Sequence, residues 1–200
     1  MKERPILFSG AMVRAILEGK KTQTRRVVKW PEGFEPETAT VERFQRYPDG
    51  SYRAIVWGSP YDDGAFSVKC KYGGPGDRLW VRETWGVHRC IEQAYQRDRC
   101  QVGVGLLHYK ADEGCHPVKR WRPCIHMPRW ASRIALEVTG VRVERVQEIS
   151  VEDALAEGML ASDPYKLAGE YEALWNEINA KRGYGWDVNP WVWVVEFKRV

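Results

Sequence analysis

Residues 19–26 read Gly-Lys-Lys-Thr-Gln-Thr-Arg-Arg and follow a short segment with helical spacing of its apolar residues. Those apolar residues are Met12, Val13, Ile16 and Leu17. Gly19 stands where a left-handed C-cap would end such a helix. If a strand begins near Thr24, then Thr24 and Arg26 lie on the same face of it. The stretch therefore predicts a helix, a glycine stop and a strand.

The same stretch also gathers four cationic side chains and two hydroxyl groups. Neighbouring cations lower the pKa of a lysine, so Lys21 is a candidate base and Thr24 a candidate hydroxyl for it to act on. For Lys21 to reach Thr24, the chain must bend after Gly19, because an unbroken strand points these two residues to opposite faces. The alternative is a solvated basic turn without chemistry.

The 200 residues, 44% of them hydrophobic, predict one domain over residues 1–200 with a sizeable core. Five cysteines without a regular spacing predict a reduced protein without disulfides. The sequence shows no signal peptide and no apolar run of membrane-spanning length, so we expect a cytoplasmic protein with no membrane partner. It gives no prediction of the oligomeric state.

The net charge of +4 is unevenly distributed along the chain. Residues 1–30 carry eight Lys or Arg against two acids, and residues 115–133 carry five against none. Residues 137–181 instead carry ten acids against four bases, which favours one basic face over a uniform nucleic-acid coat. Within the second basic segment, Arg122, Arg129 and Trp130 are candidate contacts for phosphate and base.

Strand and helix patterns are separated by long, irregular segments. Apolar alternation predicts strands at 5–8, 52–57, 78–83, 134–149 (one long strand or a hairpin pair) and 191–200. Helices are predicted at 151–157, where Ser150 and Asp153 resemble a capping box, and after Asp163-Pro164. Residues 31–70 and 86–130 read as insertions. With few helices and no βαβ repeat, we expect an α+β fold built on a small barrel with flanking helices.

Two glutamates are candidate site residues. Glu83 falls on the inward-facing side of the 78–83 strand and needs a partner, either as a structural ion pair with Arg26 or in the site itself. Glu157 precedes Gly158 in the last turn of a predicted helix, where the macrodipole raises a carboxyl pKa and suits a proton donor. The alternative for Glu157 is a solvated surface residue.

A metal site has little support in the sequence. A zinc site needs four ligands at paired short spacings, and only Cys115-His116 with Cys124-x-His126 comes near that pattern. The pattern is incomplete, so we assign no metal and no cofactor, and leave open whether these four residues bind one.

The motif Gly19-x-Lys21-x-x-Thr24-x-Arg26 resembles the signature of ASCH domains, which are PUA-like β-barrels; many members have Glu at the position of Thr24. Residues 21–26 are also similar to the Lys-Thr-x-Thr-x-Arg of small bacterial ASCH amidohydrolases that deacetylate N(4)-acetylcytidine. The resemblance extends to 76–79, 149–159 and 195–198. Residues 80–85, 127–130 and 189–191 look closer to larger ASCH proteins of phages and prophages.

The resemblance implies acyl transfer without a metal. Lys21 would be the neutral base, Thr24 the nucleophile, and Glu157 would protonate or orient the departing cytidine amine. Arg26 matches the signature arginine, and it or a backbone amide would stabilise the oxyanion. The substrate would be a modified cytidine nucleoside or RNA. Two alternatives stay open: a non-catalytic RNA reader that binds through Arg26, Arg122, Arg129 and Trp130, and a metal-independent ribonuclease that uses the same cleft.

Overall fold

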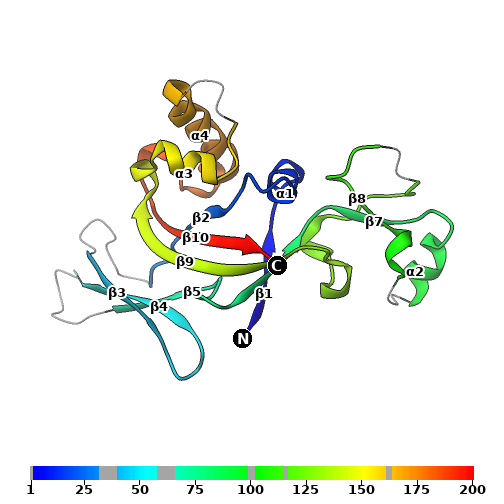
Figure 1. The fold of residues 1–200 in the computed structure, drawn as a ribbon, viewed down its shortest axis with the longest axis horizontal. Coiled ribbons are helices and arrows are strands. Elements are labelled where there is room, and N and C mark those ends of the chain that lie inside the picture. Colours follow the sequence, from blue (N-terminus) through cyan, green and yellow to red (C-terminus); the bar gives the residue numbers. More distant parts are fainter. Residues whose placement is uncertain (1, 32–39, 58–65, 99–101, 115–116, 161–163) are drawn as a thin grey trace.

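The protein is described by a computed structural model covering residues 2–31, 40–57, 66–98, 102–114, 117–160 and 164–200 (Figure 1). Its strands are β1 (Glu3–Leu7), β2 (Gln23–Val27), β3 (Thr40–Arg46), β4 (Tyr52–Trp57), β5 (Phe66–Cys70), β6 (Arg78–Arg82), β7 (Trp85–Val87), β8 (Leu107–Tyr109), β9 (Ala135–Arg145) and β10 (Trp191–Arg199). Its helices are α1 (Gly10–Leu17), α2 (Glu92–Asp98), α3 (Val151–Ala156) and α4 (Pro164–Asn179). The predicted α+β class is confirmed.

A five-stranded sheet in the order β1-β6-β9-β10-β2 forms the centre of the molecule (Figure 1). β1 and β6 are parallel and the other neighbours antiparallel. Among the described residues no ladder joins the two edge strands, β1 and β2, so the sheet is not a closed barrel. The long apolar segment at 134–149 is a single strand, β9, rather than a hairpin pair, because β10 pairs along its whole length.

The main core lies on one face of this sheet. It includes Ile6 of β1, Leu79 and Val81 of β6, and Val195 of β10, all at most 1% exposed. The inward orientation predicted for Leu79 and Val81 is therefore confirmed. α1 packs on the same core through Val13 and Ile16, so that it lies over the sheet close to β2.

The first predicted insertion contributes to the main core. β3, β4 and β5 form a second, antiparallel sheet, and the predicted strand 52–57 is β4, its central member. Ala54 and Val56 of β4 and Val68 of β5 are buried in the main core. Parts of the predicted insertion, 32–39 and 58–65, lie outside the described residues.

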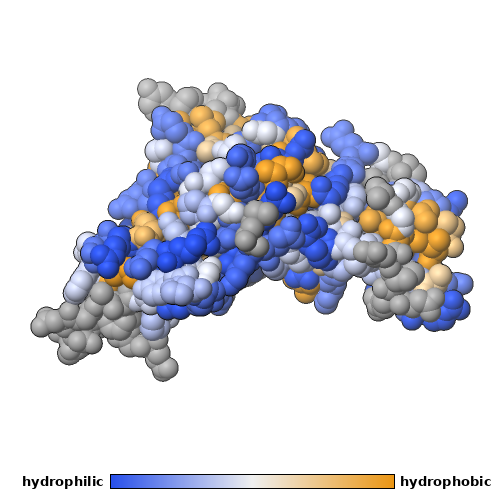
Figure 2. Space-filling model, turned by 60° about the horizontal axis from the view of Figure 1, so that its bottom comes forward, coloured by the Kyte–Doolittle hydropathy of each residue, from blue (hydrophilic) through white to orange (hydrophobic). Residues whose placement is uncertain are grey.

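The second predicted insertion has a core of its own. β7 and β8 pair, and residues 117–122 run alongside β7, where Trp85 and Arg122 exchange two backbone hydrogen bonds. A second cluster, which includes Trp85, Tyr95 and Met127, fills this unit. It projects from the end of the molecule opposite β3 and β4 (Figure 1), and apolar surface is visible at this end in Figure 2.

The other face of the central sheet is covered by α3 and α4. A third cluster joins Tyr171 and Trp175 of α4 to Val192 and Val194 of β10. The apolar face predicted for α4 is buried at Tyr171 and Trp175, but Ile178, one residue before the end of α4, is 39% exposed. No helix in the described part of the chain has both the length and the apolar character needed to cross a membrane.

Two helix ends have the predicted conformations. Gly19, with φ +73°, follows the C-cap of α1. The Ser150 hydroxyl accepts a hydrogen bond from the backbone N–H of Asp153 at 3.1 Å, which starts α3. Gly158, with φ +89°, follows Glu157 at the end of that helix. A side chain would be strained at both glycines, since L residues rarely adopt a positive φ.

Candidate functional site

The turn after Gly19 is held between two helices. The backbone N–H of Lys21 donates to the carbonyl of Ala15 in α1 at 3.0 Å, and that of Thr22 donates to Ala156 in α3 at 2.8 Å. Lys21 and Glu157 therefore lie opposite each other, as in an antiparallel pair of strands. The turn itself covers residues 18 and 19, and β2 begins at Gln23.

Lys21 and Glu157 form a buried ion pair. The Nζ of Lys21 lies 2.6 Å from Oε2 of Glu157 and donates a second hydrogen bond to the Glu157 carbonyl oxygen at 2.8 Å. The two side chains are 0% and 6% exposed. Glu157 is the C-cap of α3, so the pair also fixes the end of that helix against the turn.

The pKa of the Lys21 amine is lowered, mainly because burial disfavours its charged form. The Glu157 carboxylate opposes this shift, and Arg26 and Arg25 add smaller contributions that lower the pKa further. Neighbouring cations, the cause expected from the sequence, thus contribute less to the lowered pKa of Lys21 than burial does.

Thr24 lies in β2 and pairs with Val195 of β10. Because Val195 belongs to the main core, the Thr24 side chain points to that face of the sheet. It is 0% exposed, and no described residue makes a hydrogen bond with its Oγ1. The hydroxyl that sequence analysis assigned as nucleophile is thus buried and free to accept or donate a hydrogen bond.

Arg26 shares this face of β2, as predicted. Its guanidinium lies over the Phe8 ring at 5.3 Å, and the Nζ of Lys21 lies 5.7 Å from the centroid of the same ring. Arg26 also donates to the carbonyl of Leu7 at 2.9 Å, which connects the edge strands β2 and β1 through a side chain. Lys21 and Arg26 therefore lie over the same ring, and Arg26 shares its face of β2 with Thr24.

Arg25, on the opposite face of β2, was not identified from the sequence. It is buried and contacts Asp153 at 2.8 Å, Glu144 at 3.0 Å and Glu157 at 3.7 Å. Gln23 donates to Asp153 as well. The alternation of Gln23 and Arg25 with Thr24 and Arg26 was the sequence signal that could have placed Arg25 on the opposite face of β2. That alternation does not identify its acidic partners, which lie more than a hundred residues away in the sequence.

Asp153 is the centre of this charged network. It accepts hydrogen bonds from Arg25, Arg142 and Gln23. Burial raises the pKa of the Asp153 carboxyl, but these partners outweigh it and lower that pKa from 3.8 to about 2. The carboxylate therefore stays ionised and holds α3 on β2 and β9.

Glu83 is buried, and its partner is Arg133 rather than Arg26. Arg133 binds both carboxylate oxygens of Glu83, at 3.0 and 3.1 Å, and also pairs with Asp112 at 2.7 Å. Burial raises the pKa of Glu83, and Arg133 opposes that shift. Of the two alternatives left open for Glu83, the ion pair with Arg26 is therefore wrong, because its partner is Arg133.

Of the four residues expected to bind RNA, Arg26 lies near Lys21, and the other three lie in or near the second cluster. Arg122 is buried and pairs with Glu92 at 2.6 Å. Arg129 pairs with Glu3 at 2.8 Å on the surface, and Trp130 packs edge-on against Trp85. Their described contacts include none with Lys21, Thr24 or Glu157, so the predicted residues divide into two groups.

The structure offers no assembled metal site among the residues it describes. Cys115 and His116 lie outside those residues. Around Lys21 the described side chains supply an amine with a lowered pKa and a carboxylate that binds it. Thr24 and Arg26, on one face of β2, add a buried hydroxyl and a guanidinium.

Comparisons with protein-family models, with curated proteins and with solved structures found no match to this chain. The resemblance to ASCH domains thus depends on the motifs in residues 19–26 and the segments that accompany them.

Proposed function

We propose that this chain is an ASCH-type, PUA-like protein that removes an acyl group from N(4)-acylated cytidine, as a nucleoside or within RNA. The observation that carries the proposal is the buried contact between Lys21 Nζ and Glu157 Oε2, 2.6 Å long, next to the strand that holds Thr24. The hydrogen bond from Arg26 to the Leu7 carbonyl supports the barrel-like arrangement, since it spans the two edges of the curved sheet.

In the proposed reaction, the neutral amine of Lys21 takes the proton from Thr24 Oγ1 as this oxygen attacks the acyl carbonyl. Arg26 or a backbone N–H stabilises the resulting oxyanion. The C–N bond then breaks, and the cytidine amine leaves with a proton that Lys21 or Glu157 delivers. Water hydrolyses the threonyl ester and releases the carboxylic acid, which restores Thr24.

Burial of the site has two consequences for this mechanism. A low dielectric surrounding favours the neutral amine that the first step needs, in agreement with the lowered pKa of Lys21. The side chains of Lys21 and Thr24 are fully covered, so a substrate reaches them only when a covering side chain moves aside. Phe8, over which Lys21 and Arg26 lie, is one such side chain.

One observation favours a non-catalytic RNA reader as the second candidate. The Lys21 amine already donates two hydrogen bonds to Glu157, and these bonds connect the turn to the end of α3. A lysine with this structural task can serve a binding domain that has no turnover. A metal-independent ribonuclease using the same residues is the remaining alternative, with no contact that favours it.

The experiment is incubation of the protein with N(4)-acetylcytidine and, separately, with acetylated RNA, followed by chromatography of the products. We expect acetate from one of these substrates, together with an equal amount of cytidine from the nucleoside or of unmodified cytidine residues within the RNA. Shortened RNA would instead indicate the ribonuclease. RNA binding that weakens with salt, without any product, would indicate the reader.

A further inference from the structure

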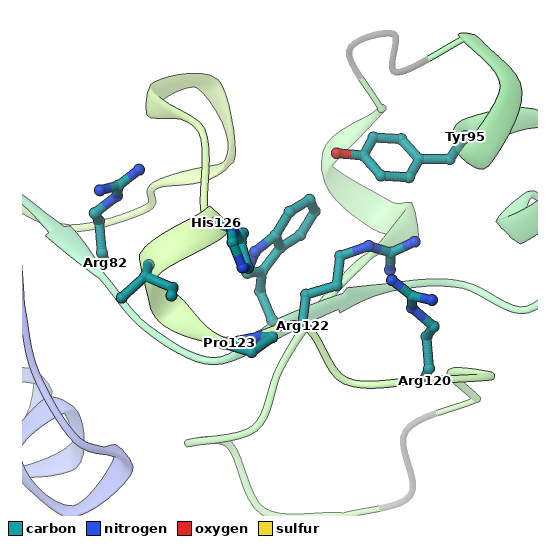
Figure 3. A pocket seen from close by; sticks show the side chains of 8 residues that line it. Arg82, Tyr95, Arg120, Arg122, Pro123 and His126 are labelled. Atoms are coloured by element: carbon teal, nitrogen blue, oxygen red, sulfur yellow. The ribbon is translucent and has the colours of Figure 1, made fainter.

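A cleft of about 540 Å³ lies in the second insertion, beside β7. Figure 3 shows the side chains that line it, among which three arginines come from two segments. The lining residues are Arg82, Trp85, Tyr95, Arg120, Arg122, Pro123, Ile125 and His126. None of them is acidic, and a cleft of this volume is large enough for a nucleotide.

Two of the arginines come from the segment beside β7. Residues 117–122 contact β7 through isolated bridges at Val118 and Arg122, with Arg122 opposite Trp85, and this segment carries Arg120 and Arg122. In Figure 3 their guanidinium groups extend toward each other, while Arg82 stands on the other side of His126. Glu92, which does not line the cleft, forms an ion pair with Arg122. Arg82 and Arg120 still give the cleft an excess of positive charge.

Two buried residues in the cleft have donor groups without an acceptor. Arg122 is 3% exposed, and its Nε and Nη1 have no hydrogen-bond partner in the described part of the chain. Trp85 is 1% exposed, and its indole Nε1 is likewise unpaired among those residues. Buried N–H groups without acceptors are unfavourable, so a ligand that brings oxygen acceptors would satisfy them.

From these observations we infer that the cleft is a binding site for the phosphate group of a nucleotide or an RNA strand. A guanidinium fork binds two oxygens of one phosphate, and arginine is favoured over lysine at such sites. Arg120 is exposed and has no described ion-pair partner, so it is available to a ligand. Arg122 and Trp85 also line the cleft and carry the buried donors that have no described acceptor.

The cleft is separate from the Lys21 site. The Arg82 side chain points away from the main core, since it alternates with Leu79 and Val81 along β6. Lys21 lies over Phe8, which belongs to the main core. The inference therefore goes beyond the proposed deacylation and stands without it.

Calorimetric titration of the full chain with three probes tests this site: inorganic phosphate, cytidine 5′-monophosphate, and a single-stranded RNA of about ten nucleotides. The decisive variant is Arg120→Glu, which reverses one exposed charge in the cleft. The matched control is Lys119→Glu, because Lys119 is the exposed neighbour of Arg120 and does not line the cleft.

We expect at least one probe to bind, and Arg120→Glu to weaken its binding roughly tenfold or more, the effect of losing a charge-assisted hydrogen bond. Lys119→Glu should change the affinity for that probe by less than about threefold, as expected for a screened surface charge. Phosphate and monophosphate binding alike would identify a small phosphate ligand, whereas much tighter RNA binding would identify a strand. Equal losses in the two variants, or no binding of any probe, would overturn the inference.

A second variant tests the floor of the cleft. Arg122→Lys keeps the charge next to Glu92 but removes the unpaired Nε and one branch of the fork. We expect a variant that is folded by circular dichroism and binds the same probe several-fold more weakly. Unchanged affinity in the folded variant would contradict the role of Arg122. If this variant does not fold, the comparison of Arg120→Glu with Lys119→Glu decides.

Discussion

At the scale of single residues, the pKa of Lys21 depends mainly on its burial. The motif in residues 19–26 identified Lys21, Thr24 and Arg26, the end of the predicted helix identified Glu157, and the resemblance implied a role for each. The structure brings Lys21 and Glu157 into contact and places Arg26 over the same phenyl ring. Sequence could not reveal that burial is the main cause of the lowered pKa of Lys21, because burial results from packing with distant segments.

Thr24 gives the sharpest test of the proposed chemistry. Thr24→Ala removes a hydroxyl that no described residue binds, so the fold should lose little stability. If Thr24 is the nucleophile, we expect this variant to lose turnover of N(4)-acetylcytidine at least a hundredfold, with ligand affinity within a few-fold. Thr24→Ser should retain measurable turnover. Near-normal turnover of Thr24→Ala would rule out a covalent threonyl intermediate.

Asp153 should make stability depend on pH in acid. Its carboxyl pKa is about 2 in the folded protein against 3.8 as the reference value, so its contribution is complete above pH 3.8 and is lost as the pH falls through about 2. Asp153→Asn should lower the free energy of unfolding at neutral pH by about 1–3 kcal/mol, because buried Arg25 loses a charged partner. Near pH 2 the difference from the natural chain should shrink.

Urea unfolding at several pH values measures this effect. The control is Glu152→Gln, which changes an exposed neighbour of Asp153 on the same turn of α3. We expect Glu152→Gln to stay within about 0.5 kcal/mol of the natural chain at every pH. A stability difference for Asp153→Asn that is constant from pH 7 to pH 2 would contradict the proposed role of its charge.

At the scale of elements, α3 connects the charged network to the Lys21 site, although it has only six residues. Ser150 caps its beginning, Asp153 fixes it to β2 and β9, and Glu157 ends it at Lys21. The cap and the glycine after Glu157 could be predicted because both signals are local. The contact with Arg25 could not, since it joins residues far apart in the chain.

Gly158→Ala should disturb this end of α3. A Cβ at this position would lie 3.0 Å from the Cβ of Ala15 and 3.1 Å from that of Lys21, on a backbone with φ +89°. We expect a loss of more than 1 kcal/mol in the free energy of unfolding, together with reduced turnover if Lys21 is catalytic. Urea unfolding and the N(4)-acetylcytidine assay measure the two effects.

Gly169→Ala is the matched control and should have the opposite sign. Gly169 lies within α4, is exposed, and a Cβ there would meet no atom within 4 Å. Alanine favours the helix over glycine by roughly 0.5–1 kcal/mol, so this variant should be more stable than the natural chain. Equal changes in the free energy of unfolding for the two substitutions would show that the limited space around Gly158 does not cause the loss of stability.

At the scale of the whole molecule, the second cluster is joined to the rest by ion pairs as well as by the chain. Arg133, two residues before β9, binds Glu83 after β6 and lies over the ring of Tyr109 in β8 at 4.0 Å. Glu83 is 1% exposed. The alternation of apolar residues along β6 predicted that Glu83 is buried. Its partner, Arg133, could not be predicted, because the path of the chain from the second insertion back to the central sheet brings the two together.

Arg133→Met should destabilise the protein by about 3–5 kcal/mol, because it leaves the buried Glu83 carboxylate unpaired. Since burial raises the pKa of Glu83, the loss should be smaller at low pH, where the carboxyl is protonated. Arg133→Met combined with Glu83→Gln should recover part of the stability. Arg43→Met, which removes only a surface pair with Glu42, should cost less than about 1 kcal/mol.

The position of β10 sets an order of assembly. Among the described strands β10 stands last in the sequence, yet it lies between β9 and β2 and provides the only ladder that β2 has in the described structure. During synthesis, more than 160 residues must therefore be added after β2 before its backbone can pair with β10. Such long-range closure slows folding and leaves an unpaired strand exposed in the meantime. Nascent chains of this protein should depend on chaperones until β10 has emerged.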